Sequence, residues 1–146
     1  MKKIGDYTVR GQIASSDSEQ HRIILFDGRF DTAYKVVGFE IANSDRDNTS
    51  SIVMSAKLLT EEGNDNTTWN WGKQDEIAWC SNAWDANGLN NRLDTHIDVD
   101  NLVVEDLFIG IYSSVAQDAN YQIFLEKYDI SDSQGALAMV RNRSQA

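Results

Sequence analysis

The sequence has a single cysteine, Cys80, and no proline. One cysteine excludes an internal disulfide framework and a cysteine-rich zinc site, and we expect Cys80 to be a small, partly buried hydrophobic residue. No apolar run reaches the roughly 20 residues that a membrane-spanning helix requires. The first residues carry two lysines but no apolar run follows them, so we expect no signal peptide for export.

Sequence motifs for catalysis and metal binding are also missing. The chain has neither the Gly-x-Ser-x-Gly turn of serine hydrolases nor a glycine-rich phosphate loop. His21 and His96 lie within alternating, strand-like patterns, without the neighbours that a metal site or an acid–base pair needs. Residues 45–48, 64–66 and 98–101 are rich in Asp and Asn, but none has the glycine and terminal glutamate of an EF-hand loop. Nothing selects a carboxylate pair for glycoside hydrolysis. We therefore expect no enzymatic activity, no cofactor and no metal, with calcium at one of the Asp-rich loops as the alternative.

The composition is that of a folded protein with a strongly acidic middle. The 146 residues are 41% hydrophobic and 10% aromatic, which predicts one domain with a sizeable core. The formal net charge is −10, and residues 40–106 contain 14 acidic and 4 basic side chains, so they carry the whole excess. Such a charge opposes direct binding of nucleic acid and favours solubility or a positively charged protein partner.

Hydrophobic periodicity predicts an all-β protein. Short segments with alternating apolar residues recur at roughly ten-residue spacing, separated by turn-like segments. We predict about eight strands, at residues 7–14, 21–26, 34–42, 52–59, 76–81, 93–99, 103–113 and 121–128. This pattern is typical of an antiparallel β-sandwich, a jelly roll or a barrel. We assign residues 1–130 to this β-sandwich domain and residues 131–146 to a helical tail.

The clearest local pattern lies in the last two predicted strands. Leu107, Ile109 and Ile111 fall on one face of the first, and Ile123 and Leu125 on one face of the second. A polar segment, residues 114–120, separates them. The period of two predicts that these runs form a paired, half-buried β-hairpin.

The C-terminal segment predicts a short amphipathic helix. Ser131 and Gln134 have the spacing of a capping box, in which side chains satisfy the first free N–H groups of a helix. A helix of two to three turns is marginal alone, so it must dock on its own domain or on another protein. The candidate contact residues are Leu137, Met139, Val140, Arg141 and Arg143.

Four tryptophans, at positions 69, 71, 79 and 84, lie within sixteen residues. Trp69 and Trp71 share a side if their segment is extended, with Asn70 between them. Large, rigid rings beside Asn and Asp suit sugar binding or a protein interface, and their alternative role is to fill the core. We expect Trp79 to be the most core-like. The candidate ligand-binding residues are Trp69, Trp71 and Trp84.

Residues 103–108 (VVEDLF), 120–121 (NY) and 126–145 (EKYDISDSQGALAMVRNRSQ) resemble the ends of small virion proteins of marine tailed bacteriophages. The resemblance covers roughly the last 45 residues and does not include the tryptophan-rich region. It implies a capsid decoration or cement protein with a jelly-roll-like body on the head surface, assembled in the bacterial cytoplasm.

Two functions therefore follow from the sequence. The first is a non-enzymatic virion protein that forms a homo-oligomer, with a trimer as one option, and docks on the major capsid protein. The second is a carbohydrate-binding β-sandwich, either a host-recognition module or a minor tail component, that uses exposed tryptophans. A small β-sandwich hydrolase is a third option with no motif behind it.

Overall fold

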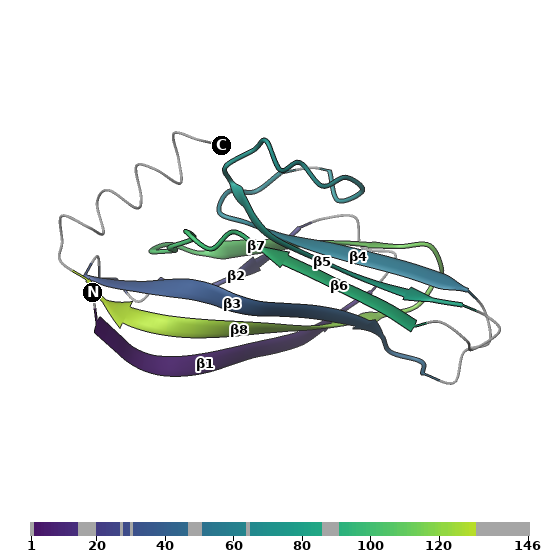
Figure 1. The fold of residues 1–146 in the computed structure, drawn as a ribbon, viewed down its shortest axis with the longest axis horizontal. Helices are drawn as coiled ribbons and strands as arrows, with labels where there is room; N and C mark the ends of the chain where they lie inside the picture. The colour runs from purple at the N-terminus through teal and green to yellow at the C-terminus, as the bar shows by residue number, and fades with distance from the viewer. Residues whose placement is uncertain are drawn as a thin grey trace.

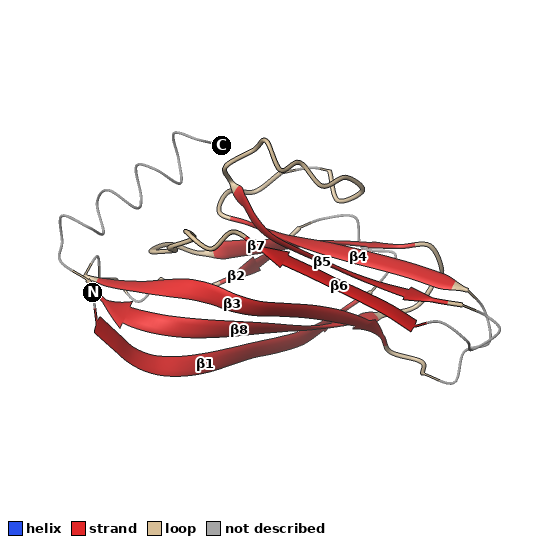
Figure 2. Cartoon of the chain, viewed as in Figure 1, coloured by secondary structure: helices blue, strands red, loops and turns tan. Residues whose placement is uncertain are grey.

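The computed structural model describes residues 2–14, 20–26, 28–29, 31–46, 51–63, 65–85 and 91–130. These residues form eight β-strands in two antiparallel sheets that lie one above the other (Figures 1 and 2). The strands are β1 (Lys2–Ile13), β2 (His21–Ile23), β3 (Thr32–Asn43), β4 (Ile52–Leu59), β5 (Glu76–Trp84), β6 (Asn91–Ile97), β7 (Leu107–Ser113) and β8 (Ala119–Asp129). Among the described residues, no helix has the length and apolar character needed to cross a membrane. The predicted helical tail, residues 131–146, lies outside the described part of the chain.

The two sheets differ in size and strand order. The smaller has the order β1-β8-β3 and the larger the order β2-β7-β4-β5-β6. Side chains from the facing surfaces form one core, in which Phe39, Leu58, Ile109 and Ile123 are each completely buried. The predicted alternation in residues 52–59 is confirmed, because Ile52, Met54, Ala56 and Leu58 are all buried in this core.

The prediction that the last two strands pair as a hairpin is wrong. Strand β7 pairs with β2 and β4, whereas β8 pairs with β1 and β3 in the other sheet. The connection between them therefore crosses from one layer to the other. Ile109 and Ile123 do point into the core as predicted, but they meet there from opposite sheets. Alternation identifies the buried face of a strand and says nothing about its neighbours.

Two further predictions need correction at this level. Val103 does not begin β7, which starts at Leu107; instead it forms an isolated bridge with Tyr34 of β3. The alternation in residues 34–42 predicts that Val37 shares the buried face with Phe39 and Ile41, yet 46% of Val37 is exposed. The register of β3 against β8 shifts between Val36 and Gly38, so this bulge turns Val36 inward and Val37 outward.

The edge of β3 that faces away from β8 is covered by polar groups. The backbones of Tyr34 and Val103 exchange two hydrogen bonds of 2.7 Å. The Asn101 side chain bonds to the β3 backbone as a neighbouring strand would. Its Oδ1 accepts from Val36 N at 2.7 Å and its Nδ2 donates to Val36 O at 3.0 Å. Further along, Thr95 Oγ1 of β6 donates to Phe39 O at 2.9 Å. The edge is therefore closed without a full strand.

Candidate functional site

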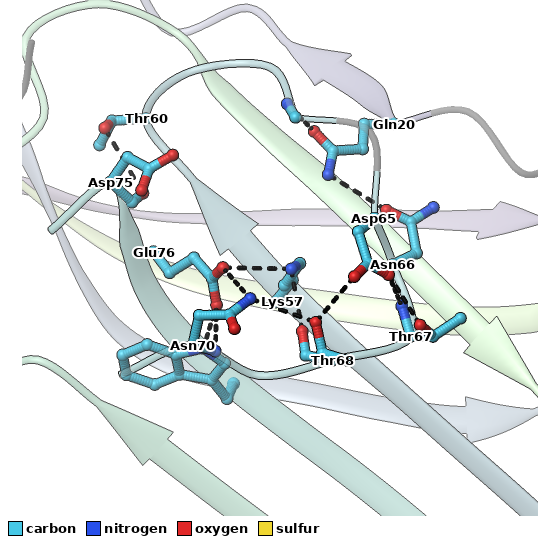
Figure 3. Close-up of polar contacts among 12 residues, drawn as sticks. Gln20, Lys57, Thr60, Asp65, Asn66, Thr67, Thr68, Asn70, Asp75 and Glu76 are labelled. Carbon is cyan, nitrogen blue, oxygen red and sulfur yellow. Dashed lines mark hydrogen bonds and ion pairs between the residues drawn. The ribbon is translucent and has the colours of Figure 1, made fainter. Parts of the chain in front are cut away.

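The connection between β4 and β5 covers the outer face of the five-stranded sheet (Figure 1). A buried ion pair underlies it, between Lys57 of β4 and Glu76 at the start of β5 (Figure 3). Lys57 Nζ lies 3.1 Å from Glu76 Oε2, and the two side chains are 3% and 1% exposed. Lys57 Nζ also donates to the backbone oxygen of Thr68 at 2.9 Å. The connection is thus attached to the sheet through charged groups that water does not reach.

The Glu76 carboxylate is the centre of this attachment. It accepts hydrogen bonds from Trp79 Nε1 at 3.0 Å, from Asn70 N at 2.8 Å and from Asn70 Nδ2 at 3.0 Å, in addition to the contact with Lys57. Burial acts to raise the pKa of Glu76, but the bonds from Trp79, Asn70 and Lys57 outweigh it and hold the pKa below its ordinary value. The carboxylate is therefore charged at neutral pH and fixes the position of Asn70, between two of the candidate tryptophans.

A second set of contacts orders the first half of the connection. Asp65 accepts hydrogen bonds from Thr67 Oγ1 at 2.7 Å, from Thr67 N at 2.9 Å and from Thr68 Oγ1 at 2.9 Å, and these bonds lower its pKa to about 2 (Figure 3). Asn66 accepts from Gln20 Nε2 at 3.1 Å. Asn66 also lies directly over Gly110 of β7, where a Cβ atom would collide with it. A glycine at position 110 lets the connection approach the sheet this closely.

The connection presents Trp69 and Trp71 beside the β5–β6 edge of the sheet. We call Trp69, Trp71, Trp79 and His96 the aromatic cluster, because their rings contact one another. The Trp71 ring centroid lies 5.9 Å from that of Trp79 and 5.4 Å from that of His96, and Trp69 lies 6.1 Å from His96. Trp71 is 62% exposed, whereas Trp79 is 7% exposed. The cluster therefore combines a buried base with an exposed, rigid surface.

Trp79 is buried, as its core-like pattern predicts, and Trp71 is exposed, whereas Trp69 is only partly exposed. Sequence reasoning did not place His96 in the cluster, because that position depends on the pairing of Trp79 with His96 between β5 and β6. His21 cannot act with His96, since their strands, β2 and β6, lie at opposite edges of the sheet.

Trp84, the third candidate, is not part of the cluster. It lies at the far end of β5, half-buried against the core, and the Arg46 guanidinium lies 5.1 Å from its ring centroid. Trp79 and Trp84 are five positions apart in the strand, which places their side chains on opposite faces and about 16 Å apart. Trp69, Trp71 and Trp79 therefore lie together, and Trp84 lies elsewhere in the fold. The C-terminal candidates Leu137, Met139, Val140, Arg141 and Arg143 lie outside the described residues.

Asp106 and Cys80 are two other buried ionisable groups. Asp106 accepts hydrogen bonds from Arg22 Nε at 2.6 Å, Leu25 N at 3.0 Å and Phe26 N at 3.2 Å; burial acts to raise its pKa, but these bonds hold it below the ordinary value. Burial raises the pKa of the Cys80 thiol, which is 1% exposed. The thiol is therefore protonated at neutral pH and has little nucleophilic character.

The Asp- and Asn-rich segment 98–101 takes part in a turn. Asp98 Oδ1 accepts from Asp100 N at 3.0 Å, and Asn101 is bound to Val36 as described above. Within the described ranges, no three His, Cys, Asp or Glu side chains come together as metal ligands. No protein-family model, no curated protein and no solved structure matches this chain.

Proposed function

We propose that this chain is a structural, non-enzymatic virion protein that decorates or cements a bacteriophage capsid through protein–protein contacts. The observation that carries the proposal is that the buried charged side chains bind other parts of the fold. Lys57 and Glu76 bind the connection between β4 and β5, and Asp106 binds the backbone of Leu25 and Phe26. The resemblance of the C-terminal segment to phage virion proteins supplies the biological setting.

We infer that the sandwich is jelly-roll-like. In a jelly roll, eight strands wrap around each other so that strand 1 pairs with 8, 2 with 7, 3 with 6 and 4 with 5. Three of these pairs, β1–β8, β2–β7 and β4–β5, are present here. The fourth is replaced, because β6 pairs with β5 and touches β3 through the Thr95 hydroxyl. Jelly rolls occur in both viral capsid proteins and lectins, so this inference is compatible with both candidate functions.

The proposed partner is the major capsid protein, and the proposed location is the capsid surface. The net charge of −10 would keep such a subunit away from packaged DNA. We propose that residues 131–146 form a short helix that docks on the shell. Its apolar and basic contact residues would be Leu137, Met139, Val140, Arg141 and Arg143.

Binding to capsids that lack this chain tests the proposal. The full chain should co-sediment with heads at a stoichiometry that matches the lattice, as measured by quantitative mass spectrometry. A variant that ends at Ile130 should keep its thermal melting point and lose binding. A full-length chain that stays in the supernatant would overturn the proposal. A truncated chain that binds normally would show that the contact with the capsid lies outside residues 131–146.

The aromatic cluster favours carbohydrate binding as a second candidate function. An exposed, rigid indole such as Trp71 offers the flat face on which a sugar ring stacks. Glycan-array binding that is lost in Trp71→Ala and weakened in Trp69→Ala would support it. Tyr112→Ala is the matched control, because Tyr112 is a 40% exposed aromatic residue of β7, which β4 separates from β5 and β6 in the sheet. Equal binding by all three variants would argue against a role for the cluster.

A further inference from the structure

Strand β1 has a long edge that no described strand covers. It pairs with β8 from Lys2 to Ile13, and the other neighbour of β8 is β3, so β1 is the outermost strand of its sheet (Figure 1). Its register against β8 is continuous from Gly5 to Ile13, and the one shift lies between Lys3 and Gly5. The opposite edge of the same sheet, on β3, is closed by Val103, Asn101 and Thr95. Within the described part of the chain, the uncovered edge of this sheet is therefore β1 from Gly5 to Ile13, where the register is unbroken.

An open edge of this kind presents unpaired N–H and C=O groups that another strand can bind. The side chains of β1 indicate which strand. Asp6, Thr8 and Arg10 alternate along one face, away from the core side on which Val9 and Ile13 lie. The Asp6 side chain is 74% exposed and contacts Lys3 at 2.8 Å. Arg10 is exposed. A strand that carries a base opposite Asp6 and an acid opposite Arg10 would match this face.

The copy of β1 in a second molecule meets this requirement in one register. When two β1 strands pair antiparallel about a two-fold axis at Thr8, Asp6 of each copy faces Arg10 of the other, and Tyr7 faces Val9. Moving the axis to Tyr7 or Val9 removes both ion pairs. Moving it further places Asp6 opposite Asp6 or Arg10 opposite Arg10, which is unfavourable. With the axis at any residue from Asp6 to Arg10, both hydrophobic cores lie on the same side of the joined sheet. Of these five registers, the one centred on Thr8 places opposite charges face to face.

We propose that β1 is the interface of a two-fold symmetric dimer in which Thr8 lies on the axis. The two three-stranded sheets would join into one sheet of six strands. Seven residues of each copy, Gly5 to Gly11, would face each other over about 24 Å. The dimer does not depend on capsid binding, so its mass in solution tests it separately from the proposed function.

A cysteine at the axis tests both the dimer and its register. Thr8→Cys should form a disulfide between two full-length chains under mild oxidation, because directly opposed residues of antiparallel strands have Cα atoms within disulfide range. Arg10→Cys is the matched control, since its two copies would lie about 13 Å apart. Cys80 is 1% exposed and should not react. Equal crosslinking of both variants, or none, would overturn the proposed register.

Charge reversal tests the ion pairs. Asp6→Arg and Arg10→Asp should each weaken the dimer about tenfold, as measured by sedimentation equilibrium, because each replaces two attractive pairs with two repulsive ones. The double variant should recover most of this loss. Glu40→Arg on β3 changes the net charge by the same amount as Asp6→Arg and should leave the dimer unchanged. A wild-type chain that is monomeric at all accessible concentrations would refute the proposal outright.

Discussion

The buried ion pair between Lys57 and Glu76 leads to the sharpest prediction about stability. Glu76→Gln keeps the size of the side chain but removes the negative charge and one of its two acceptor oxygens. The Lys57 ammonium, whose side chain is 3% exposed, would then keep the Thr68 carbonyl as a partner and lose its counter-ion. We expect the folded state to lose stability, because a buried charge without a partner is costly.

The magnitude follows from the contacts that each variant leaves behind. Breaking a buried ion pair by removing one partner typically costs about 3–5 kcal/mol. Glu76→Gln should fall in this range, since it also places an amide NH₂ group among three remaining donors, from Asn70 and Trp79. Lys57→Met should cost less, about 2–3 kcal/mol, because the carboxylate keeps those three hydrogen bonds.

Urea unfolding at pH 7, followed by tryptophan fluorescence, measures these changes. Total stabilities of proteins are about 5–15 kcal/mol, so a loss of 3 kcal/mol is easily resolved. The double variant should lose less than the sum of the single variants, because the two groups interact. Glu62→Gln makes the same chemical change at an exposed position of the same connection and should alter stability by less than about 0.5 kcal/mol. If Glu76→Gln costs under about 1 kcal/mol, the ion pair does not hold the connection in place.

Three further predictions follow from the same structure. Stability should fall in acid: the pKa values of Glu76 and Asp106 are lowered in the folded state, so their contribution is complete above the unfolded carboxyl pKa of about 4 and is lost as the pH falls below it. Urea midpoints that do not change between pH 7 and pH 3 would contradict this. Cys80 should react with a thiol reagent only at the rate of unfolding, and rapid labelling of the native protein would show that its site opens. Gly110→Ala should displace Asn66 and change the fluorescence of Trp69 and Trp71, whereas an unchanged spectrum would place the connection further from the sheet.

The fold could be predicted from the sequence as far as strand positions and buried faces. Residues 52–59 alternate cleanly, so both the position of β4 and its buried face were correct. Strand pairing could not be predicted, as the crossing from β7 to β8 shows. The turn-like residues between these strands permit a hairpin, and only the packing of both apolar faces into one core selects the crossing instead. Pairing depends on contacts between distant residues, which periodicity does not encode.

The candidate site shows the same limit. Trp71 could be recognised as a surface residue because it follows a polar residue in a segment with weak periodicity. Lys57 lies on the outer face of β4, where alternation predicts contact with solvent, yet it is buried. The connection between β4 and β5 covers it, and its ion pair with Glu76 joins residues nineteen positions apart in the chain. No local pattern distinguishes such a lysine from an exposed one.

The two proposed binding surfaces lie on different layers of the sandwich. The aromatic cluster is carried by β5, β6 and the connection before them, in the five-stranded sheet, whereas β1 is the edge of the three-stranded sheet. The acidic residues 40–106 include β4, β5 and β6, and the basic side chains Lys2, Lys3 and Arg10 lie on β1. Pairing of β1 would therefore bring together the less acidic layers of two molecules and leave both acidic layers, with their aromatic clusters, free for a partner. Because repulsion between the acidic layers would be smallest in this arrangement, the dimer should weaken only modestly at low salt.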